Sequence, residues 1–264
     1  MELSSFETLA LTREGPILTV ALNRPEQMNA TNALMERELI RFFWEVVHDA
    51  DTRVIVLTGS GRAFSGGGDM AYIRELMEEP SKIWDGLIES KRLIFALLEC
   101  TKPIIAKING HAIGLGATLS LFCDVSFAAE HVKIADPHVA VGFVAGDGGA
   151  VIWPQLVGYN RAKEYLFTGE PILAVEAARI GLINHAVPAS ELDQRVNEYA
   201  AKVASMPARA VQWTKASINI GLKQLAHSIM DASMAYEALS NATPDHREAV
   251  EAIQQKRVPN FNRD

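Results

Sequence analysis

The chain has 264 residues, of which 48% are hydrophobic and 22% are charged, an ordinary composition for a globular protein. Its formal net charge of −7 argues against a generally basic face for nucleic acid, although a local basic patch stays possible. No apolar run in the sequence approaches the roughly 18 residues of a membrane span, so we expect neither nucleic acid nor a membrane as a partner.

The N-terminal segment and the cysteines bear on the compartment. Residues 1–13 contain no basic stretch followed by an apolar one, and so they do not resemble a signal peptide. Cys100 and Cys123 lie in apolar contexts without a paired CxxC spacing, and we expect buried free thiols rather than a metal site or a catalytic thiol. Without a disulfide framework, the expected location is a reducing compartment, the cytoplasm.

The first 59 residues predict the order β-β-α-β. Weak alternation on both sides of a Gly-Pro turn at residues 15–16 predicts a hairpin over residues 7–22. Apolar residues at helical spacing predict a helix from residue 31 or 32 to residue 49. The wholly apolar run at 54–59 is typical of a strand that is buried on both faces.

Three glycine-rich turns follow. The first, at 66–68, precedes a predicted helix over 70–77 with Asp69 as its N-cap. The second, at 109–116, leads from a predicted strand over 104–108 into a helix that starts at residue 117, and the third covers 145–149. Such turns bring backbone N–H groups without intrahelical partners close to a ligand, where they can hold a phosphate or a developing oxyanion.

The rest of the chain changes from a mixed to a helical pattern. In the mixed part, the predicted elements are a helix at 81–99, strands at 123–129 and 133–135, helices at 150–156, 161–168 and 174–180, and a strand at 183–187. Beyond residue 189 only helices are predicted, at 189–204, 207–221, 223–241 and 244–255. The sequence therefore predicts an α/β fold with a helical C-terminal lobe.

The order and flanks of the three turns resemble the crotonase superfamily, the enoyl-CoA hydratase/isomerase proteins. The similarity covers nearly the whole chain, and its matching segments are 23–25 with 29–30, 62–69, 102–116, 123–124, 146–149, 166–187 and 255–261. It implies a spiral of repeated β-β-α units over residues 1–205, which carries the acyl-CoA and oxyanion site. It also implies a helical trimerisation lobe over residues 206–264, and hence a homotrimer or a hexamer built as a dimer of trimers.

The resemblance implies coenzyme A thioesters as ligands, with coenzyme A as part of the substrate, and neither a separate cofactor nor a metal. In this family two backbone N–H groups donate to the thioester carbonyl, and the matching donors here are Gly68 and Leu115. By the same comparison Gly66 presents its carbonyl to the adenine. Further candidate substrate contacts are Met28, Ala30, Thr118 and Lys256, the last as a phosphate partner.

The chain departs from the family pattern at its acid–base residues. Hydratases of this family use two glutamates, and the matching positions hold Thr118 and His138. Because a threonine hydroxyl is not a base at neutral pH, we do not expect efficient hydration of a simple enoyl-CoA. Asp147 follows His138 by nine residues across a turn, so the two side chains could meet and the carboxylate could orient a histidine base.

Residues 142–158 are especially similar to a branch that contains β-diketone hydrolases, which cleave a C–C bond by a retro-Claisen step. That branch is similar in having His138 and Asp147, together with a carboxylate matching Glu237. The sequence leaves three hypotheses. The first is an acyl-CoA enzyme that stabilises a thioester enolate, the second is a C–C hydrolase that uses His138 and Asp147 on a β-diketone or keto-acyl-CoA, and the third is a non-catalytic acyl-CoA-binding protein.

Overall fold

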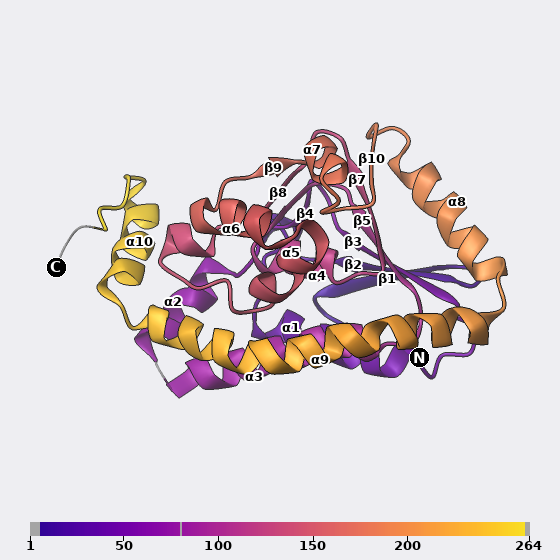
Figure 1. Cartoon of the computed structure of the whole chain (residues 1–264), viewed down its shortest axis with the longest axis horizontal. Coiled ribbons are helices and arrows are strands. Elements are labelled where there is room, and N and C mark those ends of the chain that lie inside the picture. The colour runs from indigo at the N-terminus through magenta and orange to yellow at the C-terminus, as the bar shows by residue number, and fades with distance from the viewer. Residues whose placement is uncertain (1–5, 80, 262–264) are drawn as a thin grey trace.

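The computed structural model of the protein describes residues 6–79 and 81–261. Its larger sheet has six strands in the order β1-β2-β3-β5-β7-β10, with helices packed around it (Figure 1). The first two strands form the expected antiparallel hairpin, and every later neighbour pairs in parallel. The strands are β1 (Leu9–Glu14), β2 (Ile17–Leu22), β3 (Val54–Gly59), β5 (Ile104–Ile108), β7 (Val125–Ala129) and β10 (His185–Val187).

A second sheet has four short strands in the order β4-β6-β8-β9. They are β4 (Ala63–Ser65), β6 (His111–Ile113), β8 (Lys133–Ala135) and β9 (Ile172–Leu173). Of these, β8 was predicted from the sequence. The other three were missed, because a strand of two or three residues seldom shows a hydrophobic period. The presence of β6 also corrects the expectation that the turn at 109–116 runs directly from a strand into a helix.

Helices α1 (Ala33–Val46) and α3 (Ser81–Glu99) pack together on one side of the core, and α2 (Met70–Glu78) packs on α3. The side chains of Asn32 and Asp69 cap α1 and α2 by accepting backbone N–H groups, as predicted for Asp69. The remaining helices before the C-terminal segment are η1 (Pro25–Gln27), α4 (Leu115–Leu121), η2 (His138–Val141), α5 (Gly149–Val157), α6 (Tyr159–Thr168), α7 (Ala174–Arg179) and α8 (Leu192–Ser205).

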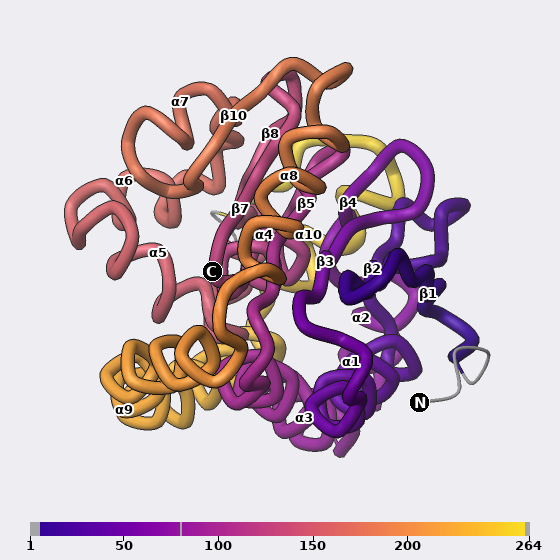
Figure 2. The backbone as a smooth tube through the Cα atoms, turned by 90° about the vertical axis from the view of Figure 1, so that its right-hand side faces the viewer, coloured from indigo at the N-terminus to yellow at the C-terminus, as the bar shows by residue number. Residues whose placement is uncertain are grey.

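The C-terminal segment contains one long helix, α9 (Ala208–Asn241), followed by α10 (Pro244–Gln255). The prediction of separate helices at 207–221 and 223–241 is therefore wrong. A glycine inside a helix costs only about 1 kcal/mol, and packing of α9 along α3 and α5 outweighs the exposed Gly221. Figure 2 shows α9 beside α3 below the sheet, and α10 contacts η2. The C-terminal helices thus reach the part of the core that carries His138.

The helices and the two cysteines bear on the membrane and redox expectations. Among the residues that it describes, no helix combines the length and apolarity needed to cross a membrane. Cys100 is buried and Cys123 is partly buried, and both are free thiols, as the sequence predicted.

Candidate active site

One cavity gathers residues from all three glycine-rich turns. Its volume is about 260 Å³. Residues 66–68 and 113–115 line it from the first two turns, while His138 and Asp147 line it from η2 and the third turn. Helices α1, α2, α3 and α9 complete the wall, so segments far apart in the sequence meet at one site.

The first two turns pack backbone against backbone at Gly67. This residue has a φ of 89°, and a Cβ built on it would lie 2.8 Å from the carbonyl oxygen of Ile113. A larger residue is therefore excluded both by conformation and by contact. Gly68 and Leu115 follow on the two turns, and among the hydrogen bonds of the described residues neither of their N–H groups is a donor. Two backbone donors are thus left available at the cavity.

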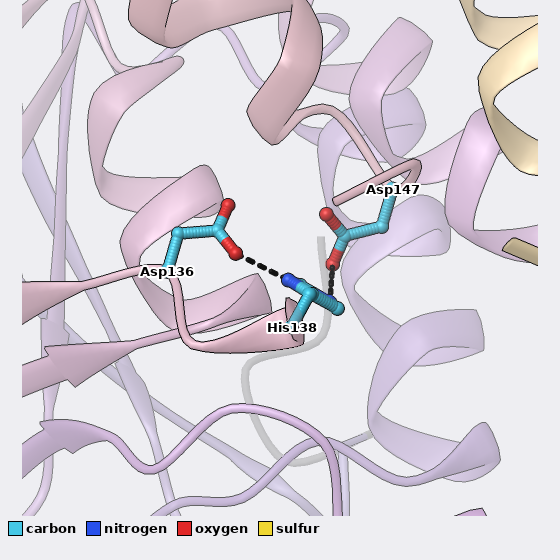
Figure 3. A group of neighbouring side chains, drawn as sticks. All are labelled: Asp136, His138 and Asp147. Atoms are coloured by element: carbon cyan, nitrogen blue, oxygen red, sulfur yellow. Dashed lines mark hydrogen bonds and ion pairs between the residues drawn. The ribbon is translucent and has the colours of Figure 1, made fainter. Parts of the chain in front are cut away.

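His138 lies between two aspartates (Figure 3). Its Nδ1 hydrogen-bonds the Oδ1 atom of Asp136, and its Nε2 lies 3.4 Å from the Oδ2 atom of Asp147. The hydroxyl of Thr118 donates to the other oxygen of Asp147 at 3.4 Å. The structure therefore brings His138 and Asp147 together and adds Asp136, which the sequence analysis did not single out.

The two carboxylates control the protonation of His138. Burial alone disfavours the imidazolium, but attraction to Asp136 and Asp147 outweighs burial and raises the pKa of His138 well above its ordinary 6.5. The imidazolium is therefore the main form at neutral pH. The site holds a proton between two carboxylates, at the edge of the cavity.

Within residues 6–79 and 81–261, Asp136, His138 and Asp147 are the one group of His, Cys, Asp and Glu side chains close enough to share a metal ion. A histidine ligates a metal through one ring nitrogen, with the other nitrogen usually donating to a neighbour. Here both ring nitrogens of His138 face a carboxylate. A proton on each nitrogen lets the imidazolium donate a hydrogen bond to Asp136 and to Asp147. The geometry suits a proton-holding group better than a metal centre.

Glu237 of α9 brings a further carboxyl group to the cavity. Among the described residues its Oε2 atom is buried without a hydrogen-bond partner, and a Cβ on Gly146 would come within 2.6 Å of it. Burial, and then the charge of Asp147, raise the pKa of Glu237 to about 8. The glycine in the third turn therefore makes room for a carboxyl group that is mostly protonated at neutral pH.

Glu36 of α1 is a cavity residue that the sequence analysis missed. Only 4% of it is exposed, and burial, followed by the charge of Asp147, raises its pKa to about 8. In the sequence it belongs to the charged run 36–38, which is typical of a solvated helix face. No local pattern distinguishes it, because its burial depends on the packing of α3 over α1.

The other predicted contacts lie in different places. Gly66 lines the cavity, and its N–H donates to the carbonyl oxygen of Met28 at 2.8 Å. Met28, Ala30 and Thr118 are not among the cavity-lining residues, and neither is Lys256, which is exposed at the end of α10. The substrate contacts of these four residues stay predictions, while Thr118 reaches the cavity indirectly through Asp147.

Comparison with known proteins shows the family of the chain. A family model described as enoyl-CoA hydratase/isomerase matches residues 12–264. The chain is 34% identical over 263 residues to a crotonyl-CoA hydratase of Syntrophomonas wolfei subsp. wolfei, covering 97% of this chain and 98% of that protein. It is 33% identical over 263 residues to a short-chain-enoyl-CoA hydratase of Clostridium acetobutylicum, covering 97% of each.

The fold agrees with this relationship. The crystal structure of an enoyl-CoA hydratase/isomerase from Mycobacterium paratuberculosis matches with a TM-score of 0.89 at 33% identity, covering 94% of this chain and 99% of that one. The expected crotonase fold is thereby confirmed. The chain belongs to the enoyl-CoA hydratase/isomerase family of the crotonase superfamily.

Proposed function

We propose that the protein is an acyl-CoA enzyme that forms and protonates a thioester enolate in this cavity. One observation carries the proposal: two unused backbone N–H groups, of Gly68 and Leu115, lie on turns that meet beside an ion-paired histidine. A Cβ on Gly114, next to Leu115, would lie 3.8 Å from the Cε1 atom of His138. The donors and the proton source are therefore adjacent.

In this proposal the N–H groups of Gly68 and Leu115 bind the thioester oxygen, where negative charge develops in the enolate. One such donor typically accelerates a reaction by about 10²–10³-fold. The neutral form of His138 first takes a proton from water as the hydroxyl adds to the β-carbon, or from another carbon of the acyl chain, and the enolate forms. The resulting imidazolium then gives its proton to the carbon next to the thioester, while Asp136 and Asp147 hold the ring. The same residues thus suit hydration or isomerisation.

The residues at the glutamate positions of the family make simple crotonyl-CoA a poor substrate in this proposal. Thr118 and His138 stand at those positions, and coenzyme A enters only as part of the substrate. Chains associate as a homotrimer or as a dimer of trimers. Exposed apolar side chains on α9 support such an assembly, and they include Trp213, Ile218 and Leu239.

The β-diketone hydrolase hypothesis has less support. Like hydration, it requires His138 to take a proton from water, so the charge of His138 favours neither reaction, and the difference in support comes from similarity to known proteins. The two relatives described above are enoyl-CoA hydratases by name. Hydrolysis of a β-diketone and binding without catalysis are therefore outcomes that the following test can detect.

Incorporation of deuterium at the α-carbon of acyl-CoAs in D₂O measures enolate formation whatever the net reaction is. We expect the wild type to catalyse this exchange and His138→Gln to lower it by about 100-fold or more. His131→Gln is the matched control because His131 is exposed and outside the cavity lining. Exchange that survives His138→Gln would contradict the proposed proton donor. Binding without exchange, or turnover of β-diketones alone, would contradict the proposed function.

A further inference from the structure

Glu36 is a buried carboxyl group at the cavity that the proposed mechanism does not use. It lines the cavity together with Ser90 of α3. The hydroxyl of Ser90 donates to its Oε1 atom over a long 3.5 Å, and its Oε2 atom is buried with no partner among the described residues. Buried polar atoms without partners are uncommon in native proteins, and each one requires an explanation.

Another buried carboxylate on the same helix is fully compensated. Glu38, two residues along the same helix, accepts from the N–H groups of Glu7 and Thr8 at 2.8 and 2.7 Å and also from the Thr8 hydroxyl. Glu36 lacks such compensation at the cavity, where a bound molecule can supply the missing partner.

The surroundings of Glu36 favour its neutral acid form. The titratable groups that face it are Asp147 on the third turn, Glu89 on α3, Tyr72 on α2 and Arg37 on α1. Burial and the two carboxylates disfavour a further negative charge, and the opposing effect of Arg37 is smaller. A protonated carboxyl group is a hydrogen-bond donor. Its neighbours in the cavity wall are mostly apolar, and they include Ile73, Leu76, Ile83 and Leu87.

We propose that this cavity selects acyl-CoAs whose acyl chain carries a neutral oxygen acceptor, such as a ketone, and that the Glu36 carboxyl group donates a hydrogen bond to that oxygen. The inference rests on the proposed function and names its substrate class. The apolar wall accommodates the carbon chain, whereas Asp147 and Glu89 disfavour a carboxylate at its end. A plain alkyl chain leaves Glu36 without a partner, and sites built to bond a polar substrate group reject analogues that lack it.

Binding to acyl-CoAs of equal chain length tests this selection. Calorimetry compares heptanoyl-CoA with its 4-oxo, 5-oxo and 6-oxo derivatives. We expect the wild type to bind at least one oxo derivative about tenfold or more tightly than heptanoyl-CoA. Glu36→Gln keeps a donor and should keep the preference, while the apolar and unbranched Glu36→Met should abolish it. Glu45→Gln on the same helix is the control, because Glu45 is exposed and outside the cavity lining.

Equal affinities in the wild type, or a preference that survives Glu36→Met, would overturn the inference. If Glu36→Met does not fold, Ser90→Ala replaces it and should weaken the preference several-fold; an unchanged preference would again overturn it. Deuterium exchange with the same compounds separates the two proposals. A binding preference without exchange contradicts the proposed function alone, and exchange without a preference contradicts this inference alone. Loss of exchange with every compound in Glu36→Gln would instead make Glu36 a proton carrier and overturn its role in selection.

Discussion

The hydroxyl of Thr118 lies 3.4 Å from a carboxylate oxygen of Asp147, to which it donates a hydrogen bond. Thr118 stands where the family resemblance predicts a glutamate, and the carboxylate is instead supplied by the third glycine turn. The packing leaves little room for a larger side chain at residue 118. A Cβ on the adjacent Gly148 would already lie 2.8 Å from the Thr118 methyl group. At this point Asp147 therefore supplies the carboxylate that faces His138, and the packing limits the size of the side chain at residue 118.

This arrangement predicts how hydratase activity could be restored. The double variant Thr118→Glu/His138→Glu places new carboxylates beside Asp147, and like charges in a buried site oppose ionisation. Adding Asp147→Ala removes one of the competing charges and creates space. We expect the triple variant to hydrate crotonyl-CoA at least about tenfold faster than the double variant, as monitored by loss of enoyl absorbance. Equal rates would mean that Asp147 does not obstruct the restored glutamates.

The contribution of the Leu115 N–H group can be tested by removing it. Leu115 is the first residue of α4, a position at which proline is tolerated because its missing N–H has no intrahelical partner. Leu115→Pro removes the N–H donor. Leu115→Ala also removes much of the buried leucine side chain but keeps the N–H donor. We expect deuterium exchange to be about 100-fold or more slower in the proline variant than in the alanine variant. Similar rates in folded variants would exclude Leu115 as an oxyanion donor.

The raised pKa of His138 predicts a particular pH dependence of stability. Asp136 and Asp147 stabilise the imidazolium in the folded protein, so its contribution is fully present below the unfolded pKa near 6.5. It is lost as pH rises through the higher folded pKa. Denaturant unfolding of the wild type and His138→Gln should therefore show an advantage of the wild type that shrinks with rising pH. A constant difference across this range would contradict the raised pKa.

The raised pKa of Glu36 predicts a second pH dependence of stability, which arises from burial of a carboxyl group. Its pKa rises from 4.5 to about 8 on folding because burial and Asp147 disfavour the charged form. Stability relative to Glu36→Gln should be greatest below about pH 4.5 and fall by about 1.4 kcal/mol per pH unit until the folded pKa is passed. Matched denaturant series in buffers from about pH 5 to 8 measure this slope. Parallel curves for the two proteins would show that Glu36 ionises normally.

Much of the fold could be predicted from the sequence because local patterns are sufficient for long elements. The apolar run at Val54–Gly59 and the amphipathic segment Ser81–Glu99 form a strand and a helix with the predicted bounds. Both are long enough to show a hydrophobic pattern. The glycine turns and their flanks also pointed to the family. The short β6 (His111–Ile113) and the unbroken α9 were missed, because pairing and packing across the fold determine them.

The candidate site, like the fold, could be predicted only in part from the sequence. By itself the sequence determined which chemical groups the chain has at its glycine turns, and it placed His138 and Asp147 near enough along the chain to meet. Only the tertiary structure decided that Asp136 flanks the same imidazole and that Glu36 is buried at the cavity. The physical reason is that burial and proximity to charge depend on neighbours far apart in sequence, such as Ser90 on α3 beside Glu36 on α1. Those neighbours set whether each acid holds its proton.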